Sequence, residues 1–307
     1  MTTQLSVYAD PQAEAAGAVS AVVASLPLSF GPAPDGPAVS APDVTAVAGH
    51  AGWTGRSADA IRNGAKGVVV SGPVAEDPAE LIAVADGAGS VVVLDQQWAG
   101  NTALAPAAGN VHSVIAVADG AGSVVVLDQQ WAGNTALAPA AGNVHSVIAT
   151  ALQDAVLLDS VAVAAPGTDP VHLLTDQLAV LVQCGITVRN VRMVQQNGNG
   201  YTVAGVLAGG VPVALQGILT SALPATASLT ILTSAGRADV VLPDPAAAWP
   251  AKVRAVTAEG ATTLPTLYES SHRTSWSRAH SHISSGIPAN DLTQFTSVMS
   301  LLSQLTS

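Results

Sequence analysis

Short apolar runs alternate with helical segments in the first half of the chain. Four runs predict buried strands: Leu5–Ala9, Val44–Ala48, Val68–Val70 and Val91–Leu94. The segments between them predict helices at Pro11–Leu26, at Ser57–Asn63 and from Asp77 through Ala85. Asp77 is suited to cap the last of these helices, and Pro78 suits its first turn. Strands that alternate with helices of about ten residues are typical of a parallel sheet.

The second half has a different pattern, in which strands follow one another through short turns. The predicted strands are Val188–Gln196, Tyr201–Leu207, Val211–Ser221, Ala225–Thr233 and Ala238–Pro243. Asn197–Gly200 and Gly209–Gly210 are hairpin signals, so these strands predict an antiparallel sheet. The last helix, Asp291–Leu305, carries apolar residues at helical spacing, and Asp291 is placed to cap it. We therefore expect two domains, residues 1–149 and 150–307.

An identical internal repeat lies across the end of the first domain. Residues 82–114 read IAVADGAGSVVVLDQQWAGNTALAPAAGNVHSV, and residues 115–147 repeat them without a change. Structural repeats normally diverge, so one identical extra unit indicates a recent in-frame duplication, an engineered insertion or a sequence-assembly error. A sheet built for one such strand must then add a second strand, extrude one copy, or exchange copies between subunits.

Composition narrows the classes of partner. The chain is 49% hydrophobic, which excludes a disordered protein, and only 10% of its residues are charged. Its formal charge of −11 makes binding to nucleic acid or to an anionic membrane surface unfavourable. Cys184 is the single cysteine, so no intrachain disulfide and no cysteine metal site are expected. With no signal-peptide pattern in Met1–Asp10 and no uninterrupted apolar span, we expect a cytoplasmic protein.

Several short anchors carry a resemblance to a known family. Ala60–Pro73 reads AIRNGAKGVVVSGP, and a helix and a strand follow it. A helix with a His, a meander with Gly-Gly before a strand, and the segment Tyr268–Pro288 ending Ser-Gly-Ile-Pro come later. This order resembles the glucose–fructose oxidoreductase / inositol dehydrogenase / MocA family. The resemblance implies a fold of class α/β plus α+β. A truncated Rossmann-like parallel-sheet domain comes first, and a domain with an open antiparallel sheet and flanking helices follows.

The residues of the cofactor turn depart from that family. A nicotinamide-binding fold needs a glycine-rich turn after its first strand, because glycine lets the backbone approach the diphosphate. Here the turn reads Asp10-Pro11-Gln12-Ala13-Glu14, so two carboxylates are expected to face the phosphates. The family's Glu-Lys-Pro, whose Lys is catalytic, matches Ser71-Gly72-Pro73, and glycine cannot transfer a proton. Lys66 lies at the opposite end of that strand.

The remaining cofactor candidates are placed by position alone. Gly49-His50-Ala51-Gly52-Trp53-Thr54-Gly55 lies between a strand and a helix, where it is suited to cradle an anion or to form an ordinary glycine-rich turn. Together with the strand end that replaces Glu-Lys-Pro, it defines the candidate cofactor-binding residues: Gly49, His50, Gly52, Ser71, Gly72 and Pro73.

Histidines supply the catalytic candidates. The family's second domain carries an Asp four residues before a His; His172 matches that His, whereas Thr168 takes the place of the Asp and Asp169 is one residue out of register. His172 is therefore the candidate acid/base, with His50 or Tyr268 as possible assistants. His272, His280 and His282 form a basic cluster with Arg273 and Arg278, interpreted as a solvated or interface face. A metal site there would need a further carboxylate or His, so none is predicted.

Two functional hypotheses follow from these matches and departures. The first is a non-redox member of the family, without a cofactor, that acts as a structural or regulatory subunit or binds a small ligand. It would form a homo-oligomer, or a hetero-oligomer with a catalytic subunit, through the second-domain sheet. The alternative is an active NAD(P)-dependent oxidoreductase with an atypical site, acting on a sugar, a cyclitol or a related small molecule.

Overall fold

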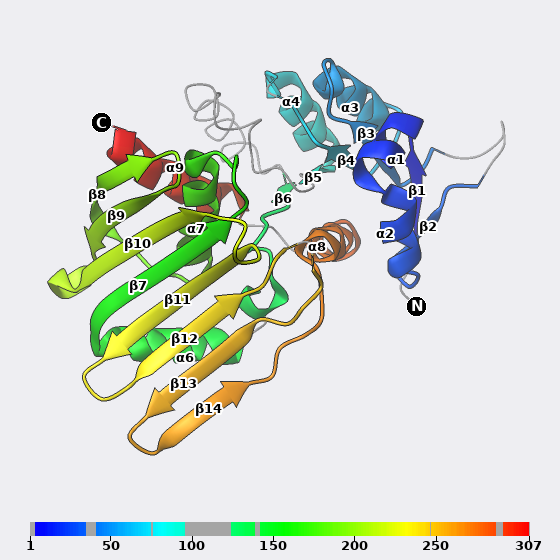
Figure 1. Cartoon of the computed structure of the whole chain (residues 1–307). Coiled ribbons are helices and arrows are strands. Elements are labelled where there is room, and N and C mark those ends of the chain that lie inside the picture. The colour runs from blue at the N-terminus through cyan, green and yellow to red at the C-terminus, as the bar shows by residue number, and fades with distance from the viewer. Residues whose placement is uncertain are drawn as a thin grey trace. The chain divides into compact units, whose positions relative to one another are not determined.

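The chain folds into two compact units, and each is described by itself. The computed structural model describes residues 4–34, 41–74, 76–95, 124–138, 142–245, 247–286 and 291–306. The first unit comprises residues 1–128 and 272–296, and the second comprises residues 129–271 and 297–307 (Figure 1). The expected boundary at 149/150 therefore differs from the observed division. Residues 272–296 join the first unit because α8 (Ser271–Ser285) packs there, with Trp276 against Phe30.

The first unit is built on a parallel sheet, as expected, and the described residues contribute six strands to it where the sequence predicts four. The strands follow the order β2-β1-β3-β4-β5-β6. Their bounds are β1 Leu5–Ala9, β2 Phe30–Pro32, β3 Val44–Ala48, β4 Gly67–Ser71, β5 Val91–Asp95 and β6 Val124–Leu127. Every neighbouring pair is parallel. The carboxyl ends of all six strands therefore lie along one edge, where open parallel sheets bind ligands.

The helices of the first unit are α1 Pro11–Gly17, α2 Val19–Ser25, α3 Trp53–Arg62 and α4 Ala79–Ala88. The single helix predicted over Pro11–Leu26 is wrong, because Ala18 takes a left-handed conformation with φ +44°. Gly17 ends α1 against the sheet, where a Cβ would lie 2.3 Å from Ser71 Oγ. Glu14 then accepts hydrogen bonds from the main-chain and side-chain groups of Ser20, so the two short helices meet at a corner.

Both copies of the repeated strand are placed in the sheet. The copies, β5 and β6, pair in parallel with Val91 opposite Val124 and Leu94 opposite Leu127, so identical residues face each other. The resemblance implies one strand after α4, and the structure has two. The extra strand was one of the three expected consequences of the repeat. The rest of the repeat between the two strands, residues 96–123, lies outside the described residues, as does the Ile287-Pro288 turn.

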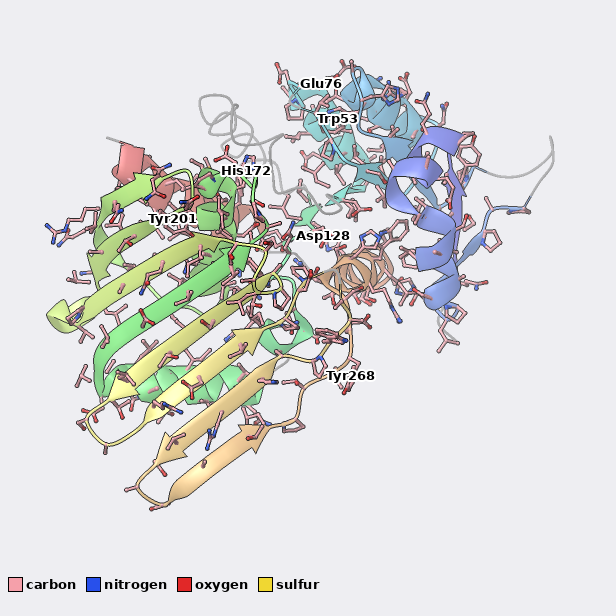
Figure 2. The ribbon with its side chains drawn as sticks, in the orientation of Figure 1. Trp53, Glu76, Asp128, His172, Tyr201 and Tyr268 are labelled. Carbon is pink, nitrogen blue, oxygen red and sulfur yellow. The ribbon has the colours of Figure 1, made fainter. Side chains whose placement is uncertain are left out.

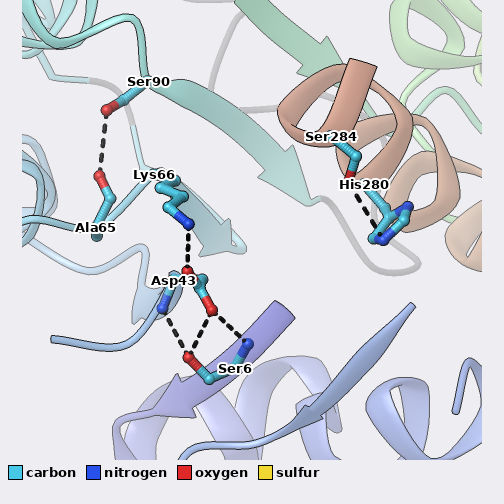
Figure 3. Close-up of polar contacts among 7 residues, drawn as sticks. All are labelled: Ser6, Asp43, Ala65, Lys66, Ser90, His280 and Ser284. Carbon is cyan, nitrogen blue, oxygen red and sulfur yellow. Dashed lines mark hydrogen bonds and ion pairs between the residues drawn. The ribbon is translucent and has the colours of Figure 1, made fainter. Parts of the chain in front are cut away.

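The amino edge of the parallel sheet is held by one carboxylate (Figure 3). Asp43 Oδ2 accepts hydrogen bonds of 2.9 Å from both the main-chain N and the hydroxyl of Ser6. Asp43 Oδ1 lies 2.8 Å from Lys66 Nζ. Burial alone would raise the pKa of Asp43, but the bonds from Lys66 and Ser6 outweigh it and lower the pKa. Lys66 is thus a structural residue at the end of β4 opposite the candidate cofactor edge.

Replacing Asp43 with alanine is expected to lower the free energy of unfolding by about 1–2 kcal/mol, because Ser6 and Lys66 lose a charged acceptor. A carboxyl whose pKa is lowered on folding contributes stability above its unfolded pKa, and that contribution is lost as the pH falls through the folded value. The deficit of the variant should therefore shrink below pH 4. Urea unfolding at pH 7 and at pH 3 checks this; an equal deficit at both pH values would contradict it.

The second unit is built on an eight-stranded sheet in the order β14-β13-β12-β11-β7-β10-β9-β8. The strands are β7 Ala155–Ala164, β8 Arg189–Asn197, β9 Gly200–Val206, β10 Pro212–Leu219, β11 Thr226–Thr233, β12 Arg237–Leu242, β13 Lys252–Thr257 and β14 Gly260–Leu264. The expected fold class is confirmed, with one difference: β10 pairs in parallel with β7, so the sheet is mixed. The central strand β7 pairs with one parallel strand and one antiparallel strand. Local sequence pattern cannot predict this, because the pairing depends on residues far apart in the chain.

Helices α6 Gly142–Gln153 and α7 Pro170–Gln183 pack on this sheet. A buried polar chain joins α7 to the strands: Tyr201 donates to Gln177, and Gln177 donates to Ser160 Oγ over 2.9 Å. Burial raises the pKa of Cys184, just after α7, to about 12, so the thiol stays protonated and inert at neutral pH.

The last helix is α9, Asp291–Thr306. Asp291, which the sequence predicts to cap this helix, is its first residue. Its carboxylate accepts a hydrogen bond of 2.8 Å from the main-chain N of Leu127 and forms an ion pair with Arg278. Within the described ranges, no helix is long and apolar enough to cross a membrane.

Candidate functional site

Four of the expected cofactor residues, Gly49, Ser71, Gly72 and Pro73, meet at the carboxyl edge of the parallel sheet. The main-chain N of Gly49 donates to Ser71 O over 2.8 Å, and the main-chain N of Val74 donates to Gly49 O over 2.7 Å. A Cβ on Gly49 would lie 2.3 Å from the Pro73 Cα, so only glycine permits this approach. The turns after β3 and β4 are therefore joined by main-chain hydrogen bonds and by close backbone packing.

The glycine-rich turn after β3 holds a carboxylate of the chain itself. Glu76 accepts hydrogen bonds from the main-chain N of Gly52 and, at 3.2 and 3.0 Å, from the main-chain N and hydroxyl of Thr54. Burial would raise the pKa of Glu76, but these bonds and the charge of Arg56 lower it. Figure 2 shows Glu76 beside Trp53 at the start of α3. A carboxylate of the chain itself therefore lies at the N-terminus of this helix, where a helix binds an anion.

Sequence reasoning missed Glu76 because nothing local links it to residues more than twenty positions earlier. His50 lies on the same turn with an exposed side chain, and Arg56 Nη2 donates to its main-chain O over 2.9 Å. Trp53 is buried at the turn, where its indole N donates to Val74 O over 2.8 Å. Trp53 therefore bridges the turns after β3 and β4.

The turn after β1 carries a second carboxylate cap. Asp10 Oδ1 accepts from the main-chain N of Ala13 over 2.6 Å, and Oδ2 accepts from the main-chain N of Ala48 over 3.3 Å. Both Asp10 and Glu14 were expected to face this turn, and only Asp10 does. Glu14 bends away and caps α2 through Ser20. A single negative charge therefore stands at the helix N-terminus where dinucleotide-binding folds place a diphosphate.

A third group of polar residues lies at the same edge. Asp95 ends β5, Asp128 follows β6, and His272 lies in the first turn of α8. His272 Nδ1 is 2.9 Å from Asp95 Oδ1 and 3.4 Å from Asp128 Oδ2. Burial would lower the pKa of His272, but the two carboxylates outweigh it and raise it to about 10. Burial, together with the neighbouring Asp128, raises the pKa of Asp95 despite His272.

This grouping changes the interpretation of the histidine cluster as a solvated face. His272 points at two buried carboxylates, and His280 is buried with its ring edge-on to Phe30, at a centroid distance of 5.4 Å. Its Nε2 is 3.4 Å from Ser284 Oγ (Figure 3). The spacing of basic residues along α8 could not show this, because the partners come from β2, β5 and β6.

His172 belongs to the second unit, at the start of α7. Asp169 caps this helix by accepting from the main-chain N of Val171 over 2.8 Å, and its Oδ2 is 4.0 Å from His172 Nε2. The Asp that is out of register in sequence therefore still reaches the histidine. Tyr268 lies beyond β14 and is 77% exposed (Figure 2).

Comparison with known proteins identifies solved structures with a similar fold. A scan against protein-family models and a search of curated proteins find no match. Among solved structures, the 3-ketoreductase KijD10 of Actinomadura kijaniata, with TDP-benzene and NADP in an open conformation, is 14% identical with a TM-score of 0.63. The match covers 99% of this chain and 98% of that chain. The UDP-N-acetylglucosamine 3-dehydrogenase GnnA of Acidithiobacillus ferrooxidans is 12% identical with a TM-score of 0.61, covering 99% and 97%.

The chain has the fold of these oxidoreductases. They are of the glucose–fructose oxidoreductase / inositol dehydrogenase / MocA type that the sequence resembles, so the resemblance is confirmed as a fold. The expectation that no cofactor belongs to this chain is contradicted, because the 3-ketoreductase with this fold is in complex with NADP. That expectation weighed the turn after β1 and the missing Lys at Gly72, whereas an open α/β sheet binds ligands along its whole carboxyl edge.

Two turns at the carboxyl edge differ in how well they would accommodate a dinucleotide: the turn after β4 leaves room for it, and the turn after β1 carries a negative charge. Gly72 has φ +61°, and a Cβ built on it would meet no described atom within 4 Å, so the turn after β4 is open. Its main-chain N donates to Asp95 O over 2.7 Å, which holds the turn in place. At the turn after β1, the Asp10 carboxylate occupies the helix N-terminus. A diphosphate bound there would meet a like charge, so its contacts must differ from those of a glycine-rich turn.

Proposed function

We propose that the chain is an NAD(P)-dependent oxidoreductase that acts on a sugar, a nucleotide-linked sugar or a related polyhydroxy compound. The likeness of fold over 99% of the chain to the NADP complex of a 3-ketoreductase is the observation that carries this proposal. The second neighbour is named as a dehydrogenase of a nucleotide sugar. These neighbours favour the redox alternative over a non-redox subunit. Association through the second-domain sheet stays a prediction.

The cofactor would lie at the carboxyl edge defined by Gly49, His50, Gly52, Ser71, Gly72 and Pro73. When bound, it supplies the hydride acceptor or donor. Gly72 has no side chain, so the nicotinamide ring of the cofactor could approach the main chain closely at this position. It also leaves the proton transfer to another residue. We assign that role to His172, which would take the proton of a substrate hydroxyl in oxidation and return it in reduction.

A fluorescence titration with NADPH and NADH tests cofactor binding first. Trp53 lies buried at this edge and should report a ligand through a change in its emission. Saturable binding is the expected result. No saturation up to millimolar concentrations of either cofactor would overturn the proposal.

Turnover then tests the acid/base assignment. NADP+ reduction should be screened with UDP- and TDP-linked hexoses, free hexoses and cyclitols. With an active substrate, His172→Gln is expected to lower kcat about 100- to 10,000-fold and to leave cofactor binding unchanged. His145→Gln is the matched control, because His145 is a partly buried helical histidine of the same unit that contacts Leu137 O at 3.1 Å. Equal activity of the two variants would show that His172 is structural.

A further inference from the structure

The cluster of Asp95, Asp128 and His272 takes no part in the proposed reaction. One oxygen of each carboxylate and one ring nitrogen of the histidine all lie within 4.8 Å of one another. Asp95 is 0% exposed and Asp128 7% exposed. All three residues belong to the first unit, so the cluster is complete within one compact body. Two acidic groups are rarely buried side by side without a compensating charge.

The repeat explains why the two carboxylates meet. Asp95 and Asp128 are equivalent positions of the two copies, one residue beyond Leu94 and Leu127. Because β5 and β6 pair in parallel with identical residues opposite, both aspartates reach the same edge. The main-chain N of Asp128 donates to Leu94 O over 3.1 Å and fixes this register. The second copy of the strand therefore places an identical carboxylate next to the first one.

Few hydrogen-bond donors besides His272 reach the two carboxylates. Apart from the contacts of His272 Nδ1 with Asp95 Oδ1 and Asp128 Oδ2, the polar atoms of the cluster are poorly satisfied: Asp95 Oδ2, Asp128 Oδ1 and His272 Nε2 have no hydrogen-bond partner among the described residues. Two carboxylates and one imidazolium carry a net charge of −1, and a buried net charge is costly. Two carboxylates, a neutral imidazole and a divalent cation sum to zero. A cation would also use the oxygen lone pairs that are otherwise unpartnered.

We propose that Asp95, Asp128 and His272 bind one divalent transition-metal cation. Carboxylate oxygen and imidazole nitrogen together favour Mn²⁺, Fe²⁺, Co²⁺ or Zn²⁺ over Ca²⁺ and Mg²⁺, which take oxygen ligands. Three protein ligands leave at least one coordination position for water. The cation ties the ends of β5 and β6 to the start of α8. The sequence placed His272 in a cluster with His280 and His282 but did not show that Asp95 or Asp128 lies near it, which is why no metal site was predicted.

Metal binding to the full chain is the direct test. The protein should be purified without a polyhistidine tag, stripped with a chelator and dialysed against Co²⁺, Zn²⁺ or Mg²⁺. One equivalent of Co²⁺ and of Zn²⁺, with no retained Mg²⁺, is the expected result. Bound Co²⁺ should show visible absorption bands in the presence of a nitrogen ligand. Failure of the unmodified chain to retain a stoichiometric amount of either transition metal would overturn the proposal without recourse to variants.

Single substitutions locate the site. Asp95→Asn, Asp128→Asn and His272→Gln should each weaken Co²⁺ binding by at least tenfold, and Asp43→Asn and His50→Gln should not change it. Circular dichroism of each apo variant confirms that it is folded; the two Asp→Asn changes remove a buried like charge and keep the shape of the side chain. Unchanged Co²⁺ binding in all three cluster variants would place the metal elsewhere and refute the assignment.

Thermal unfolding gives a readout that does not depend on activity. A ligand that binds only the folded state raises the midpoint, by about 5 °C or more at a hundred times its dissociation constant for a unit of this size. Zn²⁺ or Co²⁺ should give this shift in the unmodified chain and lose it in Asp128→Asn. A chain in which the cluster is an ion triad without metal would show no shift on adding either cation, and that result would contradict the proposal.

Discussion

Replacing Trp276 with alanine is expected to lower the free energy of unfolding of the first unit by about 3–5 kcal/mol. The side chain is 0% exposed, and its ring meets Phe30 edge to face at a centroid distance of 5.4 Å. It belongs to the cluster of buried residues that also includes Val7, Val69 and Val126. Removal of the indole leaves a cavity that the surrounding strands cannot close, because the core is packed from both the sheet and α8.

Urea unfolding followed by circular dichroism measures this loss. Trp249→Ala is the matched control, because it makes the same change at a tryptophan that is 59% exposed. The control should cost less than about 0.5 kcal/mol. If Trp276→Ala cost no more than Trp249→Ala, α8 would not be part of the core of the first unit. The division of the chain into units that includes residues 272–296 would then be wrong.

Replacing Asp10 with asparagine is expected to tighten NADPH binding by about 10- to 100-fold. Two unit charges 4 Å apart interact by about 4 kcal/mol at an effective dielectric constant of 20, and solvent at the sheet edge reduces that figure. Asn caps a helix as well as Asp does, so the bond to the main-chain N of Ala13 is kept while the charge is removed. The gain should shrink as the salt concentration rises, because it is electrostatic.

Glu14→Gln is the control for this prediction. It removes the same charge from the same helix, at a carboxylate that bonds to Ser20 instead of the turn after β1. Trp53 fluorescence titration of the three proteins at low and high salt compares their dissociation constants. If both variants bound NADPH as the unmodified chain does, the diphosphate would not lie at the N-terminus of α1, although the cofactor itself would still be bound.

Local pattern predicted most strands and the class of the fold. Apolar runs such as Val44–Ala48 and Ala225–Thr233 are strands in the structure within one or two residues. Glycine positions were also informative: Gly64 follows the end of α3 with φ +104°. These features depend on residues that are close in sequence, so side-chain type and spacing are enough to predict them.

Tertiary structure decided the features that depend on distant residues. Ala18 breaks a helix that its own propensity favours, because Gly17 approaches Ser71 and Glu14 bonds to Ser20. The strand β7 pairs in parallel with β10, and Glu76 fills the turn at Gly52. No local pattern contains these partners.

The candidate site divides in the same way. The sequence by itself determined that a glycine, Gly72, follows β4 and that a carboxylate, Asp10, stands at the first turn. It also determined that two identical strands carry identical aspartates. Only the parallel, in-register pairing of β5 with β6 and the return of α8 to the first unit brought Asp95, Asp128 and His272 together. The physical reason is that residue type is a local property, whereas the electrostatic partner of a buried charge is decided by packing between distant segments.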